Sequence, residues 1–268
     1  MPVDNEATVF AQLPDTTYRY VSTPWMESAT ALNGLGTDAT VCENECGVTM
    51  IMSITAFSKT AALEADPLIE HGLTEFTAVD LVTCQSATAR EGVQVLTSLI
   101  DEYGSSEVNI ALIADQKETW YIEMYSGHQY AAVKLPADKV SVFGNEFLLD
   151  YVSEYEDCIL SEDLEMLAVE NGFAVYGEDG EMNLLATYSG EDVVTNYSHM
   201  RTWIGHQILS PSDSGEYHKE DLHPLCFVPE KNTLKNGRNP ETHEVIDEKK
   251  EIPPLEVDLD SSVYAVEP

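Results

Sequence analysis

Two asparagines stand where a side-chain amide could stabilise a developing negative charge. Asn44 comes just before a glycine-led apolar stretch at residues 47–55, and Asn145 comes just after an apolar stretch at residues 140–143. An amide held at the end of a strand can donate N–H to an oxyanion without bringing a charge of its own. Local sequence alone favours a plainer interpretation of both, because asparagine is common at strand ends and turns.

Arg201 is the third residue that could act in a site. The chain has only 13 lysines and arginines against 48 acids, and Arg201 lies among aromatic residues in the run 197–203. In so acidic a chain we expect its guanidinium to have a carboxylate partner, which either the protein or a substrate could provide. Taken alone, the residue favours a structural ion pair.

Other motifs point away from cofactors and metals. Residues 34–39 match G-x-G-x-x-A, but no helix pattern follows them, so we expect a turn and not a nucleotide site. Residues 243–247 begin like a zinc-protease motif and end in aspartate. Cys42 and Cys46 have no second Cys or His pair to complete a zinc site, and we interpret them as ordinary thiols at the entry of a strand. The prediction is therefore a chain without a cofactor or metal.

The pattern of apolar residues predicts an α+β fold around an antiparallel sheet. A long helix is expected over residues 78–103, where apolar residues recur at helical spacing and Gly104 follows. Short strands joined by tight turns then predict an antiparallel meander, whose middle strand alternates between two faces over residues 119–125. Further strands are expected at residues 17–21, 47–55, 109–114, 129–135 and 140–143, and further helices at residues 161–172 and 198–209.

The composition limits the partners and the compartment. A net charge of −35 excludes nucleic acid and anionic membrane surfaces, because binding to phosphates needs clustered lysine and arginine. No apolar run approaches the roughly 20 residues of a membrane-spanning helix. The odd number of five cysteines favours a reducing compartment. The first residues carry no secretory signal, so the chain as it stands is expected in the cytoplasm, and an upstream signal would instead make it secreted or surface-bound.

Several segments together resemble the C69 (U34) dipeptidase family, which belongs to the N-terminal-nucleophile (Ntn) hydrolases. The resemblance covers about residues 10–230 and is carried by the order and spacing of its pieces. The pieces are LPDTTYRY at 13–20, NECGVTM at 44–50, ADPL at 65–68, ATAREGV at 87–93, WYIEMYSGHQY at 120–130 and VFGNEF at 142–147.

The resemblance implies a fold, a mechanism and roles for the three residues. The fold is an αββα four-layer sandwich of two antiparallel sheets with helices outside. The nucleophile of the family is a cysteine at the first position of the mature chain, whose own α-amino group is the base, and the substrates are short peptides, chiefly dipeptides. Asn145 resembles the oxyanion-hole asparagine of the superfamily, Asn44 is implied to shape the pocket, and Arg201 to help hold the site.

This sequence departs from the family at the nucleophile. Only 12 residues precede Leu13, and none is cysteine, so we expect a chain that begins after the catalytic strand and is inactive alone. The internal cysteines have no free amine beside them. Residues 1–232 are then an incomplete Ntn-hydrolase domain, and residues 233–268 an acidic, proline-containing tail that is poorly ordered or peripheral.

Two alternatives remain open. One is an amidase similar to penicillin V acylases and bile salt hydrolases, which belong to the same superfamily. The other is a non-catalytic interaction module that keeps the sandwich, in which unpaired sheet edges would favour a homo-oligomer.

Overall fold

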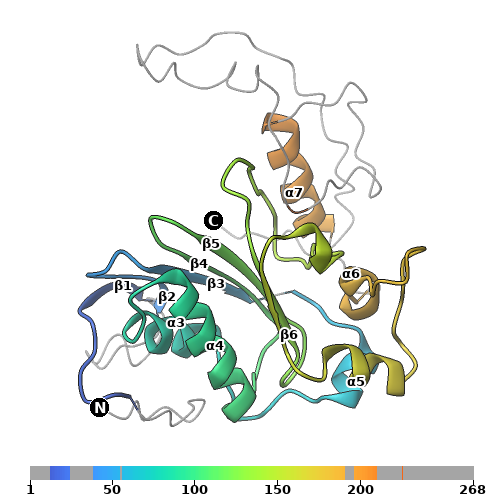
Figure 1. The fold of residues 1–268 in the computed structure, drawn as a ribbon, viewed down its shortest axis with the longest axis horizontal. Coiled ribbons are helices and arrows are strands. Elements are labelled where there is room, and N and C mark those ends of the chain that lie inside the picture. Colours follow the sequence, from blue (N-terminus) through green and yellow to red (C-terminus); the bar gives the residue numbers. More distant parts are fainter. Residues whose placement is uncertain (1–12, 25–38, 55, 191–195, 210–224, 226–268) are drawn as a thin grey trace, which may run out of the picture.

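The structure is a computed structural model that describes residues 13–24, 39–54, 56–190, 196–209 and 225 (Figure 1). Its centre is a seven-stranded antiparallel sheet whose strands lie side by side in chain order. The strands are β1 Tyr20–Pro24, β2 Ala39–Asn44, β3 Thr49–Ile54, β4 Asn109–Ala114, β5 Thr119–Met124, β6 Tyr130–Lys134 and β7 Cys158–Leu160. The helices are α2 Thr60–Ala65, α3 Glu75–Thr83, α4 Ala89–Tyr103, α5 Leu164–Glu170, α6 Leu184–Tyr188 and α7 Asn196–Leu209, with a short 3₁₀ turn at Val152–Glu154.

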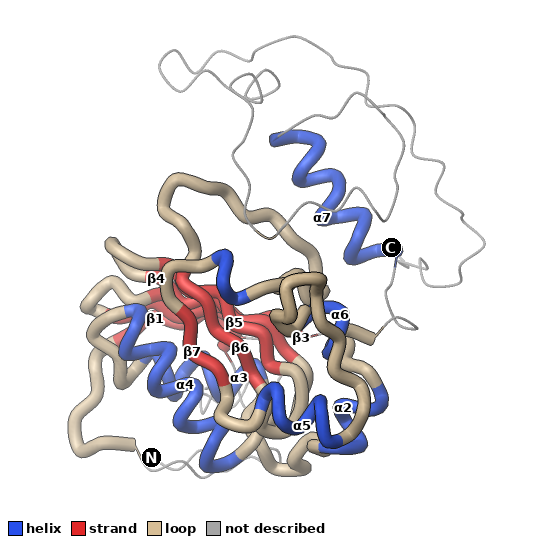
Figure 2. The backbone as a smooth tube through the Cα atoms, turned by 45° about the vertical axis from the view of Figure 1, so that its right-hand side comes forward, coloured by secondary structure: helices blue, strands red, loops and turns tan. Residues whose placement is uncertain are grey.

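The sheet carries an apolar core on each face. On one face, α3 and α4 lie together over the strands and bury side chains such as Met50 and Trp120 (Figure 1). On the other face, α5, α6 and an irregular segment pack against Tyr121 and Tyr125. Helix α7 stands away from α3 and α4 in both views (Figures 1 and 2). The mixed helix and antiparallel-sheet class is confirmed, while the second sheet of the expected sandwich is not among the described residues.

Strands β4, β5 and β6 confirm the predicted meander. Each neighbouring pair is antiparallel, and the strand bounds agree with the expected ranges to within one residue. Along β5 the alternation also holds, since Trp120 and Ile122 belong to the core under α4 and Tyr121 belongs to the opposite core. No helix of the described residues has the length and apolar character needed to cross a membrane.

The prediction of one helix over residues 78–103 is wrong, because two helices occupy that stretch. Helix α3 ends at Thr83, and α4 begins at Ala89 after Thr88, whose side chain caps it by accepting from the Glu91 amide at 3.2 Å. The side chain of Asn44 accounts for the break, because its amide donates to the carbonyls of Thr83 and Ser86. These carbonyls would bond within the helix if it continued.

Residues 140–149 form the segment that we call the strap, and the strand predicted at 140–143 does not form. Backbone groups of Val142 and Gly144 in the strap bond to α7 side chains. His206 Nε2 donates to the Val142 carbonyl at 3.0 Å, and the Gly144 amide donates to Thr202 Oγ1 at 2.8 Å. Gly205 makes the close approach possible, because a Cβ there would lie 2.0 Å from Cγ1 of Val142.

Two predicted elements are shifted. The strand expected at 17–21 begins at Tyr20, and the helix expected to open at Ser161 begins at Leu164. The Ser161 hydroxyl bonds to Tyr130 N and to the Gln129 side chain, so it holds a loop to β6 and does not cap the helix. Strands β2 and β7 and helices α2 and α6 were not expected, because each is short and lacks a clear periodicity.

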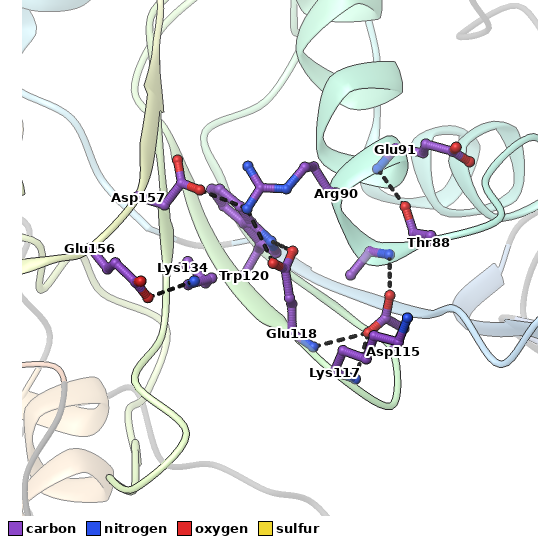
Figure 3. A network of polar contacts seen from close by, with 11 residues as sticks. Thr88, Arg90, Glu91, Asp115, Lys117, Glu118, Trp120, Lys134, Glu156 and Asp157 are labelled. Atoms are coloured by element: carbon purple, nitrogen blue, oxygen red, sulfur yellow. Dashed lines mark hydrogen bonds and ion pairs between the residues drawn. The ribbon is translucent and has the colours of Figure 1, made fainter.

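Arg90 fastens the start of α4 to the sheet. Its Nη2 lies 2.6 Å from Asp157 Oδ2 and 3.1 Å from Glu118 Oε1, and its guanidinium carbon lies 4.9 Å from the centre of the Trp120 ring (Figure 3). The guanidinium lowers the pKa of the Asp157 carboxyl through this hydrogen bond. Asp115 completes the junction, because its Oδ2 accepts from the first amide of α4 at 2.8 Å.

Some predictions lie outside the described residues. These are the turn expected near residues 34–36, the boundary at 232 and the acidic tail 233–268.

Candidate functional site

Asn145 lies on the strap beside the end of β3. Its Nδ2 donates to Ser53 Oγ, and its Oδ1 accepts from Arg201 Nη2 at 2.5 Å. A guanidinium can only donate, so the amide oxygen faces Arg201, and the two N–H donors of the amide lie on the side of β3. The structure thus brings together two of the three predicted site residues, Asn145 and Arg201.

Helix α7 supplies the surface on which Asn145 and its neighbour are held. Arg201 and Thr202 lie three and four residues after Ser198, which places both on the same side of the helix as Ser198. Arg201 Nη2 also donates to Ser198 Oγ at 3.2 Å, and Thr202 Oγ1 donates to the buried carboxylate of Glu146. Because Glu146 follows Asn145 directly, α7 fixes two consecutive residues of the strap.

A small pocket opens beside Asn145. It has space for about one water molecule. Two phenylalanines make its apolar wall, and a carboxylate, an amide and two hydroxyl-bearing residues make its polar wall. The lining residues are Phe57, Asn145, Glu146, Phe147, Ser189, Gly190 and Ser198.

Asn44 lies elsewhere. It ends β2 and faces the turn into β3, at the opposite end of β3 from Ser53, which is four residues beyond Thr49 or roughly 13 Å. Its side chain is buried and makes four hydrogen bonds to backbone groups: Nδ2 donates to the Thr83 and Ser86 carbonyls, and Oδ1 accepts from two amides of the turn. The structure does not bring Asn44 to Asn145.

Four cysteines fall within the described residues, and none of these four lies beside Asn145. Cys42 is buried on the face covered by α3, where its thiol donates to Asp80 Oδ1 at 3.3 Å. Burial and the Asp80 carboxylate raise the pKa of Cys84 to about 11 and raise that of Cys42 further. A thiol that keeps its proton at neutral pH is a poor nucleophile. Cys158 is exposed on β7, four strands from β3, or roughly 19 Å away.

Glu123 is a buried carboxylate near the site that motif reasoning missed. It lies on β5, fully shielded from solvent, and accepts from the hydroxyls of Tyr121 and Tyr125 and from the amides of Leu148 and Leu149. Burial raises its pKa to about 7, although the four hydrogen bonds oppose that rise. The only signal in the sequence was an acid inside an apolar strand, and nothing local indicates its partners.

Comparisons with known proteins identify the family of the chain. Residues 4–235 match the model of peptidase family C69. A probable dipeptidase B of Streptococcus pyogenes serotype M6 is 33% identical over 207 residues, which cover 76% of this chain and 40% of that protein. A probable dipeptidase B of Lactococcus lactis is 31% identical over 229 residues, which cover 84% of this chain and 47% of that protein.

A probable dipeptidase of Latilactobacillus sakei is 28% identical over 213 residues, which cover 44% of its length. The chain therefore spans less than half the length of these curated relatives. The family match covers most of the chain, and the chain belongs to peptidase family C69.

Proposed function

We propose that this chain provides the oxyanion-binding side of a dipeptide hydrolase. Asn145 donates N–H to the carbonyl oxygen of the scissile peptide bond as negative charge develops there. Arg201 holds the amide oxygen of Asn145 and so keeps the donors turned toward β3. The contact between Arg201 and Asn145 carries the proposal, and the curated relatives named as probable dipeptidases support the substrate class.

The proposed nucleophile is a cysteine thiol with a free α-amino group beside it, as the family resemblance implies. The amine takes the thiol proton, and the sulfur bonds to the peptide carbonyl carbon. The proton then passes to the leaving amine as the C–N bond breaks. Water hydrolyses the resulting thioester and releases the acid and the thiol. An α-amino group with a pKa near ~8 suits this exchange at neutral pH.

Distance supports placing this nucleophile outside the described residues. An oxyanion donor lies about 3 Å from the oxygen that it stabilises, and the attacking sulfur must reach the carbon bonded to that oxygen. Within the described ranges, Cys42 is on the far face of the sheet and Cys158 is roughly 19 Å across it. We propose that none of the four cysteines in the described ranges is the nucleophile, and that residues 1–268 alone bind peptide but do not hydrolyse it.

Asn44 has an indirect role in this proposal. Its four backbone bonds hold the β2–β3 turn to the end of α3. It would shape the pocket only by fixing the position of β3, which carries Ser53 at its other end.

Binding of a phosphinic dipeptide tests the oxyanion role. In this probe a negatively charged P(O)O⁻ group replaces the scissile amide and imitates the tetrahedral oxyanion. We expect calorimetry in high salt to detect binding to the purified chain, and Asn145→Ala or Arg201→Lys to weaken it about tenfold or more. Asn171→Ala is the matched control, because Asn171 is exposed and its side chain bonds only to a helix carbonyl. Binding unchanged by Asn145→Ala would contradict the role.

Hydrolysis assays test the nucleophile. Purified 1–268 should release no amino acids from a panel of dipeptides. Hydrolysis abolished by Cys42→Ala or Cys46→Ala would overturn the proposal. A substrate panel on a longer chain that supplies the cysteine should include penicillin V and a conjugated bile acid, because cleavage of these in place of dipeptides would favour the amidase alternative.

A further inference from the structure

Glu123 lies where burial of a charged carboxylate costs free energy. Its carboxylate is fully buried, and an ionisable group in such a place is tolerated only with strong hydrogen bonds. Here the carboxylate accepts from Tyr121 at 2.6 Å, Tyr125 at 2.9 Å, Leu148 N at 2.6 Å and Leu149 N at 3.0 Å. Two phenols thus orient the carboxylate, and two backbone amides are held by it.

The two amides belong to the strap, three and four residues after Asn145. Within the described ranges the strap is not one of the seven strands of the sheet, and its Leu148 and Leu149 amides bond to a side chain in place of a ladder carbonyl. Oε1 of Glu123 takes the place of such a carbonyl for both Leu148 and Leu149. The carboxylate therefore fixes where the strap lies on the sheet just beyond Asn145.

The same two tyrosines also hold the strap by their rings. Tyr121 meets Phe143 edge-on with ring centres 5.0 Å apart, and Tyr125 meets Phe147 edge-on at 4.9 Å. Phe143 and Phe147 stand two residues on either side of Asn145. The rings and the carboxylate thus act on the strap from β5 and from Tyr125, the residue that follows it, and their contacts bracket Asn145.

We infer that Glu123, oriented by Tyr121 and Tyr125, is a positioning residue that sets the placement of Asn145 against Arg201 and Ser53. It acts through the strap and does not touch the substrate. One consequence of this inference rests on the proposed function, namely that oxyanion binding depends on Glu123. The placement itself can be measured without any ligand.

The decisive variant is Glu123→Gln, which keeps the shape of the side chain. Its amide oxygen can still accept from Tyr121 and the strap, but its NH₂ end cannot accept from the Tyr125 hydroxyl, and the loss of the negative charge weakens all of these hydrogen bonds. Asp80→Asn is the matched control, because Asp80 is also a buried carboxylate but lies on α3 over the other face. Tyr125→Phe is a milder second variant that leaves the carboxylate three of its four donors.

The readout is the pair of side-chain amide resonances of Asn145 in a ¹⁵N correlation spectrum, assigned by their loss in Asn145→Ala. We expect Glu123→Gln to shift or broaden them and to weaken phosphinic dipeptide binding about tenfold. Tyr125→Phe should shift the Asn145 resonances in the same direction but by a smaller amount. This second variant keeps the test valid if Glu123→Gln fails to fold. Asp80→Asn should lower stability and leave them unmoved.

Two results would overturn the inference: unmoved Asn145 resonances in both Glu123→Gln and Tyr125→Phe, or an equal movement in Asp80→Asn. If the unmutated chain binds no phosphinic dipeptide, the proposed function fails. The resonances still decide whether Glu123 positions Asn145.

Discussion

Replacement of Asn44 by alanine should destabilise the fold strongly. The change removes two donors to the Thr83 and Ser86 carbonyls at 2.7 and 2.6 Å, and an acceptor for the Cys46 and Val48 amides at 3.0 and 3.1 Å. Four hydrogen bonds at about 1 kcal/mol each amount to about 4 kcal/mol. Thr83, Ser86 and Val48 are fully buried, so water cannot easily replace three of the four bonds. We expect a loss of about 3 to 4 kcal/mol.

Urea unfolding followed by tryptophan fluorescence measures this loss, with the slope of the transition compared between variants to exclude a change in the unfolded state. Asn171→Ala is again the matched control, because it removes one exposed bond to the Leu167 carbonyl and should cost less than about 0.5 kcal/mol. A loss below about 1 kcal/mol in Asn44→Ala would refute the view that this side chain holds the β2–β3 turn to α3.

Four further results are expected. Arg90→Ala should lower the free energy of unfolding by about 1 kcal/mol at pH 7. Since Arg90 lowers the pKa of Asp157, the share of this difference that comes from the ion pair should decline as the pH falls through that lowered value, and a difference that stays constant throughout the acid range would contradict the ion pair. Glu123, with a pKa raised from 4.5 to about 7, should contribute stability that is complete below about pH 4.5 and is lost as the pH rises through 7. Urea midpoints of Glu123→Gln should lack that decline. Iodoacetamide at pH 8 should label exposed Cys46 in the folded chain and buried Cys42 only after unfolding, as mass spectrometry of peptides would show. Raising NaCl from about 0.1 to 1 M should raise the urea midpoint, because screening weakens the self-repulsion of a chain with net charge −35, and a flat response would contradict that reasoning.

The elements that could be predicted from sequence are those whose partners are close along the chain. The β4–β6 meander is such a case, because tight turns fix its pairing and alternation fixes its faces. The strap is the opposite case. Its residues 140–143 alternate like a strand, but Val142 and the following Gly144 bond to His206 and Thr202, some sixty residues away. Nothing local distinguishes a segment that bonds to helix side chains from one that joins a sheet.

The break between α3 and α4 has the same cause. Helical spacing continues across residues 84–88, and the group that ends α3 is the side chain of Asn44, about forty residues earlier. Asn44 and Asn145 looked alike in sequence, since each stands at a predicted strand boundary. Asn44 bonds to four backbone groups, whereas the amide oxygen of Asn145 accepts from the guanidinium of Arg201. Only the contacts that surround each asparagine in the fold distinguish their roles.

Those surroundings also bear on how an oxyanion could be stabilised in so acidic a chain. Arg19, Arg90 and Lys134 each pair with carboxylates, which offset their positive charge. Arg201 donates to the amide oxygen of Asn145. A guanidinium at that oxygen polarises the amide and makes the N–H groups at its other end stronger donors. Under the proposed function, the positive charge of Arg201 acts on the oxyanion through the amide of Asn145. The guanidinium itself does not need to contact the substrate. Lysine at position 201 would keep the charge but lose the planar fork that aligns it, which is why Arg201→Lys is a sharper test of this coupling than removal of the charge.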